Sequence, residues 1–163
     1  MIELPLFFDV EVEWKEKRGG ELRSEGLPAV AVAAPPEFQG QEGTWTPEHL
    51  FVASVNACFM TTLLAIAENS RLEIVKLSSK ATGRLEKTDG SGYQITEIVL
   101  KPDLVIRAAK DLERAARLVE KAEKNCLISN SIKSAIKLEP KVYHEQSPVH
   151  PCPPVSGSTA KSG

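Results

Sequence analysis

The sequence TPEHLFVASVNACFMTTLLAIA, residues 46–67, decides the fold. Thr46 can cap a helix, Pro47 fits its first turn, and Glu48 places a negative charge near the positive end of the helix dipole. The 18 residues from 50 to 67 carry no charged side chain. The sequence therefore predicts a helix from Pro47 to about Asn69 that is apolar on all sides.

This helix is long enough to span a membrane, but its composition favours a buried core helix. It contains Ser54, Asn56, Thr61 and Thr62, and no belt of Lys or Arg flanks it closely. We therefore predict no membrane association. The strands that the chain can form would cover one face of such a helix but scarcely its whole circumference. The missing cover is most simply a second copy of the chain, so a homodimer is predicted.

Outside the helix, the first part of the chain is typical of short strands. Residues 7–17 alternate apolar and polar side chains, which predicts a half-buried strand. Residues 18–21 (Arg-Gly-Gly-Glu) read as a hairpin turn, followed by short strands over 21–24 and 29–34. Residues 35–45 hold two prolines and two glycines and are expected to form a loop.

The second part predicts a long hairpin and a second helix. Residues 73–87 and 93–107 flank Asp89-Gly90-Ser91-Gly92, a strong turn signal. A helix is expected over about 108–125, with a short helical turn and a last strand over 132–143. These elements make one α+β domain over residues 1–146. Residues 147–163 are rich in proline and serine and are predicted to be a tail.

Composition narrows the class of protein. A length of 163 residues suits one domain. A net charge of −2 gives no positive electrostatic field that would bind nucleic acid. An odd number of cysteines, three, argues against a secreted disulfide framework. The N-terminus lacks the basic head and cleavage site of a signal peptide, so a cytoplasmic location is expected.

Two of the cysteines occupy unusual places. Cys58 lies in the middle of the apolar helix, and Cys126 lies at the exit of the charged second helix. A cysteine inside a buried helix is most often a packing residue, but a second one at a helix exit indicates a redox pair. Cys152 and His150 in the tail are too few for a metal site, and no cofactor or metal motif is present.

Residues 46–59 and Asn125-Cys126-Leu127-Ile128-Ser129-Asn130 resemble the two signature motifs of the OsmC and organic hydroperoxide resistance family. The order of elements is similar as well. The resemblance implies an intertwined homodimer in which antiparallel sheets wrap a long central helix. It also implies a thiol-dependent peroxidase that reduces organic hydroperoxides without a cofactor.

The resemblance assigns roles to individual residues. Cys58 matches the peroxidatic cysteine and Cys126 the resolving one, so a Cys58–Cys126 disulfide is implied. Glu48 matches the glutamate of the family, although a first-turn residue that only favours the helix dipole is nearly as good an interpretation. Arg18 is the best match to the arginine of the family, with Arg23 close by.

Two further expectations complete this view of the family. Leu127 stands where the family often has proline. The reductant would be a dithiol, in this family usually a lipoylated protein. An alternative from another class is a non-catalytic dimeric module that binds a small apolar ligand at the subunit interface.

The chemistry itself requires a thiolate. A free cysteine has a pKa near 8.5, and burial would raise the pKa of Cys58 further. The N-terminus of its helix is too distant to help, so we expect a cation such as Arg18 to stabilise the thiolate. Glu48 could orient that arginine, but it lies about 15 Å from Cys58 along a straight helix. If both serve one site, Glu48 should come from the other subunit.

Overall fold

The computed structural model describes residues 2–90 and 92–145, so the predicted tail with His150 and Cys152 lies outside the described residues. The elements in chain order are β1 (Glu11–Glu16), β2 (Gly19–Arg23), β3 (Val30–Ala33), η1 (Pro36–Phe38), α1 (Pro47–Asn69), β4 (Ile74–Thr88), β5 (Gly92–Ile106), η2 (Ala109–Asp111), α2 (Leu112–Lys124), η3 (Ser129–Ser131), β6 (Ala135–Leu138) and β7 (Lys141–His144). The order and type of elements confirm the predicted α+β class.

The strands form two sheets. β1, β2 and β3 make an antiparallel sheet, and β4 and β5 make the predicted long hairpin. β6 and β7 each pair with β5 in parallel, so this sheet is mixed. The prediction of a helical turn and one strand over 132–143 was therefore wrong in part. Side chains alternate between half-buried and exposed on both sides of Pro140, which is the period of two short strands.

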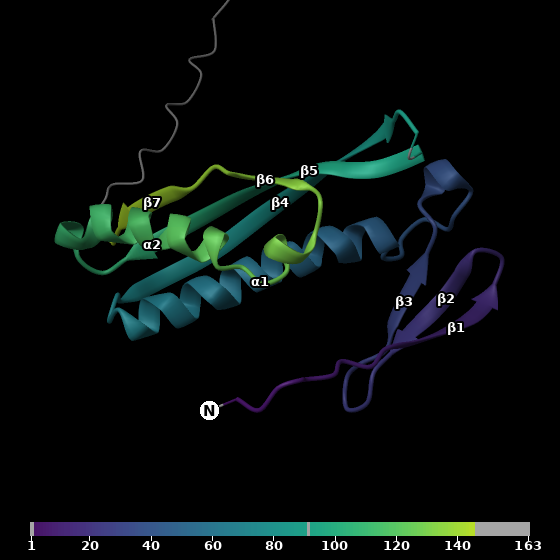
Figure 1. Ribbon diagram of the computed structural model, residues 1–163, viewed down its shortest axis with the longest axis horizontal. Coiled ribbons are helices and arrows are strands. Elements are labelled where there is room, and N and C mark those ends of the chain that lie inside the picture. The colour runs from purple at the N-terminus through teal and green to yellow at the C-terminus, as the bar shows by residue number, and fades with distance from the viewer. Residues whose placement is uncertain (1, 91, 146–163) are drawn as a thin grey trace, which may run out of the picture.

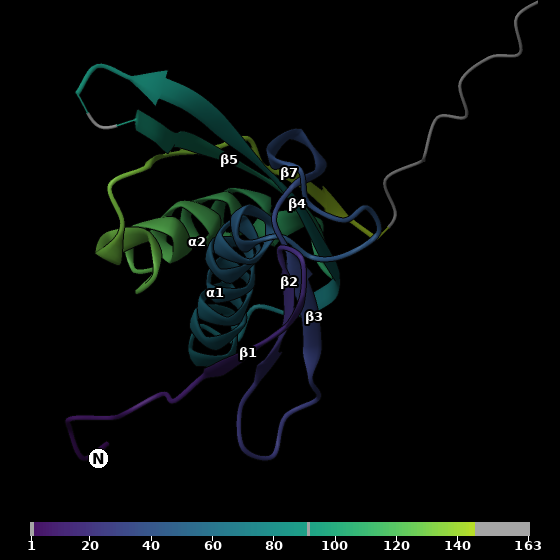
Figure 2. The same cartoon turned by 90° about the vertical axis from the view of Figure 1, so that its right-hand side faces the viewer.

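Helix α1 has the predicted bounds, and its start follows from its sequence. The Thr46 hydroxyl accepts a hydrogen bond from the His49 N–H at 3.2 Å. Figure 1 shows α1 running along the β4–β5 hairpin, and Figure 2 shows it beside α2. Its buried residues recur every four positions, at Val55, Phe59, Leu63 and Ala67. Burial of Phe59 and Leu63 contributes about 1.5–3 kcal/mol each.

Within one chain, α1 is buried on one face only. Met60 and Leu64 point away from the core and are 39% and 42% exposed. The expectation of a helix buried all round is therefore not met by a single chain, because β4 and α2 cover the same side. α1 is also long and apolar enough to span a membrane, but its buried face packs as a core helix does.

In the described part of the chain, nothing covers the apolar side of the β1–β3 sheet either. Figure 1 shows it standing apart from the hairpin at the N-terminal end of α1. Val12 and Trp14 of β1 are 68% and 72% exposed, although their alternation predicts a half-buried strand. The predicted homodimer would supply this cover, and it stays a prediction.

The first hairpin turn lies earlier than its glycines suggest. Lys17 and Arg18 make the turn, Lys17 with a φ of 47°, and Glu16 pairs with Gly19. Gly20 lies in β2, where an added Cβ would come within 2.5 Å of the Glu13 carbonyl oxygen. This glycine therefore permits a close approach of two strands rather than a turn, and Arg18 sits at the tip of the hairpin.

Candidate active site

The structure brings Cys58 and Cys126 together in one chain. Cys58 is half-buried near the middle of α1, and Cys126 is fully buried just after α2. Both thiols are free, and the Cys126 side chain forms a hydrogen bond with the Cys58 side chain. The two thiols are therefore close enough to interact, and the disulfide and the roles of the two cysteines stay predictions.

A tight turn after α2 presents Cys126 to α1. The Cys126 N–H donates to the Glu123 carbonyl at 3.1 Å, which closes the helix end. The Asn130 side chain donates to the Lys124 carbonyl at 3.0 Å, and the Ser131 hydroxyl donates to the Leu127 carbonyl at 2.8 Å. Short polar side chains in this segment therefore hold the turn in place by bonding to its backbone.

The surroundings of Cys58 favour its ionised form. Partial burial acts to raise the pKa of Cys58, but hydrogen bonds from the Ile128 N–H, the Cys126 thiol, the Thr62 hydroxyl and the Leu127 N–H together lower it below its usual value. From the sequence, a cation is expected to be needed for this shift. In the described part of the chain, however, the groups that lower this pKa are neutral hydrogen-bond donors.

The pKa of Cys126 shifts in the opposite direction. Burial raises the pKa of the Cys126 thiol, and its hydrogen bond to Cys58 raises it as well. Bonds from the side chain and backbone of Ser129 offset only part of this rise. The pKa values of the two thiols therefore move apart, that of Cys58 downward and that of Cys126 upward.

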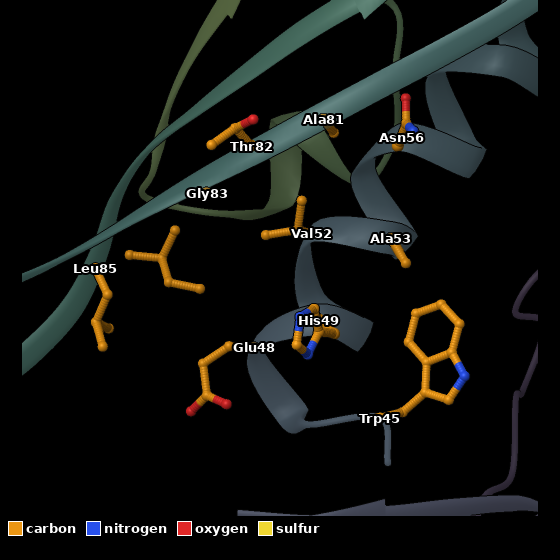
Figure 3. A pocket seen from close by; sticks show the side chains of 11 residues that line it. Trp45, Glu48, His49, Val52, Ala53, Asn56, Ala81, Thr82, Gly83 and Leu85 are labelled. Atoms are coloured by element: carbon orange, nitrogen blue, oxygen red, sulfur yellow. The ribbon is translucent and has the colours of Figure 1, made fainter. Parts of the chain in front are cut away.

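Glu48 lies at the start of α1 and lines two cavities. The smaller cavity, of about 450 Å³, is enclosed by α1 and β4. Figure 3 shows Glu48 and Trp45 on opposite sides of His49, with Asn56 farther along α1. One oxygen of Glu48, Oε2, is buried and has no hydrogen-bond partner among the described residues. A donor from outside the described chain would satisfy this carboxylate.

The larger cavity, of about 650 Å³, lies on the other side of Glu48. Its lining is largely apolar and includes Phe51 of α1 and Ile132, which follows the turn of Cys126. Phe51 precedes Cys58 by about two helical turns and so lies on a similar face of α1, about 10 Å away along the axis. The cysteine pair and this cavity are therefore neighbours along α1, although neither thiol lines it.

Arg18 reaches the rim of the larger cavity and not Cys58. Its guanidinium donates to the Phe38 carbonyl. The ring of Phe38 packs edge-on against Tyr93 with centroids 5.3 Å apart, and both rings line the cavity with Glu48. Neither Arg18 nor Glu48 is among the groups that hydrogen-bond Cys58 in the described chain. A single chain therefore leaves the predicted constellation in two parts.

Arg23 is engaged elsewhere. Its guanidinium pairs with Glu21 at 2.5 Å and with Glu13 at 3.2 Å on the β1–β2 sheet. Arg18 forms no ion pair with a described residue. Of the two arginines that the sequence left open, Arg18 is therefore the one free to pair with a carboxylate.

Sequence reasoning missed three donors to Cys58. Thr62 could have been found, because it lies one helical turn after Cys58 on the same face. The N–H groups of Leu127 and Ile128 had no comparable signal, since the direction of a backbone amide in a turn is not written in its side chains. As for metals, the described residues contain no group of three or more His, Cys, Asp or Glu side chains placed to hold one.

Comparison with known proteins agrees with this arrangement. The family model described as OsmC-like protein matches residues 40–141, which include both cysteines and Glu48. The chain belongs to the OsmC-like protein family. A relative, the uncharacterized protein YmaD of Bacillus subtilis (strain 168), is 28% identical over 138 residues, which are 81% of this chain and 90% of that protein.

Solved OsmC-like structures share the fold. A protein of unknown function from Vibrio cholerae, VCA0330, matches with a TM-score of 0.77 and 24% identity, over 84% of this chain and all of that one. An organic hydroperoxide resistance protein from Legionella pneumophila matches with a TM-score of 0.67 and 23% identity, over 86% of this chain and 99% of that one. Family membership points to a redox or peroxidase role, and similarity at these identities shows the fold alone.

Proposed function

We propose that the protein is a thiol-dependent peroxidase that reduces organic hydroperoxides to alcohols. The observation that carries this proposal is the hydrogen-bonded pair of Cys58 and Cys126, whose pKa values move in opposite directions. The attacking thiol must be ionised, and a second thiol must lie beside it to condense with the sulfenic acid. A packing cysteine would need neither property.

The reaction balances with the two thiols as the source of two electrons. The Cys58 thiolate attacks the distal oxygen of the hydroperoxide, the O–O bond breaks, and the alkoxide leaves and takes a proton to become an alcohol. Cys58 is then a sulfenic acid. The Cys126 sulfur attacks this sulfur, the hydroxide leaves as water with the Cys126 proton, and a disulfide forms. A dithiol, in this family a lipoylated protein, returns both cysteines to thiols by exchange.

The larger cavity supports a substrate with an apolar group. Its side chains from α1, β5 and the segment after η3 offer mainly carbon surface, with Glu48 at one edge. An alkyl or lipid hydroperoxide would bury its chain there by the hydrophobic effect, whereas hydrogen peroxide has no group to place in it.

A second copy of the chain completes the proposed site. Among the described residues, Glu48 Oε2 is buried without a hydrogen-bond partner, and nothing covers the apolar faces of α1 and β1. In a homodimer, Arg18 and Glu48 of one subunit would meet Cys58 of the other. There the guanidinium would add its charge to the local donors, oriented by the carboxylate.

The same cavity also favours one alternative, a non-catalytic module that binds a small apolar ligand. Consumption of cumene hydroperoxide with a dithiol reductant separates the two. A peroxidase consumes the peroxide, Cys58→Ser loses that activity by orders of magnitude, and Thr61→Ser, an exposed neighbour on α1, keeps it. Wild-type protein that binds cumene alcohol but consumes no peroxide would instead support the binding module.

A further inference from the structure

We propose that the backbone N–H groups of Leu127 and Ile128 form a thiolate-binding site that holds Cys58 ready for attack within a single chain. The inference rests on the proposed function only for its catalytic use. The site itself concerns a thiol of the resting protein, whether or not a peroxide is ever reduced.

The first observation is that these two N–H groups are available. In the turn after α2, the N–H groups of Cys126, Asn130 and Ser131 donate to backbone carbonyls at 3.0–3.1 Å. Those of Leu127 and Ile128 donate to no backbone carbonyl in the described chain, and both bond the Cys58 side chain instead. Two successive amides that point at one atom are a common way to bind an anion.

The second observation is that the turn cannot easily move away. The Asn130 side chain ties it to the Lys124 carbonyl, and the Ser131 hydroxyl ties it to the Leu127 carbonyl. Cys126, at the start of this turn, is fully buried and belongs to the hydrophobic core. Because the donors are fixed before the thiolate forms, little reorganisation is needed when Cys58 ionises.

The third observation concerns where charge lies. The described groups that bond Cys58 are two amides, a thiol and a hydroxyl, all neutral. An ionised sulfur surrounded by neutral donors keeps its negative charge, so the same atom can still attract a cation from a partner subunit. The amide pair and the arginine would therefore add to each other rather than compete.

Leu127→Pro tests the inference, because proline has no N–H and so removes one donor while the chain length is kept. Ionisation of Cys58 is followed by its rate of alkylation with iodoacetamide against pH, without peroxide, in a Cys152→Ser background. We expect the rate at pH 7 to fall by up to about tenfold, which is the effect of one unit of pKa change. The control variant Leu127→Ala keeps the N–H and should show the same pH profile as the wild-type protein.

A measurement on the unaltered turn covers the case in which the proline variant does not fold. In ¹⁵N-labelled protein, the amide proton shifts of Leu127 and Ile128 should titrate with the midpoint found by alkylation of Cys58, and should not titrate in Cys58→Ser. A folded Leu127→Pro protein with an unchanged alkylation profile would overturn the inference. Amide shifts that ignore the ionisation of Cys58 would overturn it too. Neither result depends on peroxidase activity, which is measured separately.

Discussion

The Cys126 thiol, at the end of the α2 turn, donates a hydrogen bond to Cys58 in the middle of α1. This one contact lowers the pKa of the acceptor and raises the pKa of the donor. Burial reinforces the difference, because Cys58 is half-buried and Cys126 is wholly enclosed. The fold thus makes two chemically identical side chains unequal, and the proposed peroxidase depends on that inequality.

The first prediction concerns selective alkylation. In a Cys152→Ser background, iodoacetamide should modify Cys58 well before Cys126, because only the thiolate is nucleophilic and only Cys58 is accessible. The lowered pKa means that the thiolate persists below the usual range and is lost as the pH falls through that lowered value. The rate should therefore rise with pH and level off at a lower pH than the rate of a free cysteine does. Peptide mapping by mass spectrometry locates the label, and equal labelling of both cysteines in folded protein would contradict the prediction.

The second prediction separates two arginines. Arg18→Met should slow alkylation of Cys58 and consumption of cumene hydroperoxide about tenfold at pH 7, with little effect at pH 9, because it removes the cation supplied by a partner subunit. Arg23→Met is the matched control, since that guanidinium is already paired with Glu13 and Glu21 at the surface. If neither variant alters the pH profile, the donors of the turn act alone. An effect of Arg23→Met only would reverse the assignment.

The third prediction is about assembly. Light scattering should show a stable homodimer at micromolar concentration, burying more than about 2,000 Å² as obligate dimers do. Trp14→Glu should shift the protein toward monomer. The substitution replaces an exposed indole of β1, which the partner subunit would cover, with a charged carboxylate. Lys15→Glu adds a carboxylate to the opposite face of the same strand and should leave the dimer intact. A wild-type protein that is monomeric under these conditions would refute the shared site.

The fourth prediction tests the packing of β4 on α1. A Cβ at Gly83 would lie 2.5 Å from Val52 Cγ2, closer than side chains pack. Gly83→Ala should therefore reduce the free energy of unfolding by about 1–3 kcal/mol, measured by urea denaturation. Val52→Ala opens the missing space, so the double variant should lose less than the sum of the two single losses. Additive losses would show that this contact does not limit the approach of strand and helix.

Local signals in the sequence explain which parts of the fold could be predicted. The cap of Thr46 and Pro47 gave the start of α1, and the Asp89-Gly90 turn gave the β4–β5 hairpin, because both depend on a few adjacent residues. The glycines after Arg18 led to a wrong prediction, which placed the first turn at residues 18–21 instead of at Lys17 and Arg18. Gly20 serves a close contact with the Glu13 carbonyl, and that need depends on a partner strand.

Burial and amide direction could not be predicted in the same way. The hydrophobicity of α1 predicts that the helix is covered, but it does not reveal which chain supplies the cover. Leu64 is exposed in a single chain. At the site, the sequence named both cysteines and placed them together. The Leu127 and Ile128 donors could not be predicted, because the side chains of a turn do not reveal the direction of its backbone N–H groups. Without these donors, a cation was the remaining way to stabilise the Cys58 thiolate, and for that reason the sequence predicts one.

The central claim is that Cys58 and Cys126 form one redox pair, and mass spectrometry after a single turnover tests it most directly. One equivalent of cumene hydroperoxide per subunit, in a Cys152→Ser background and without reductant, should convert both thiols to an intramolecular Cys58–Cys126 disulfide and release one alcohol. Cys126→Ser should stop at a Cys58 sulfenic acid that dimedone traps. If the peroxide leaves both thiols reduced, or oxidises Cys126 while Cys58 stays free, the account is contradicted.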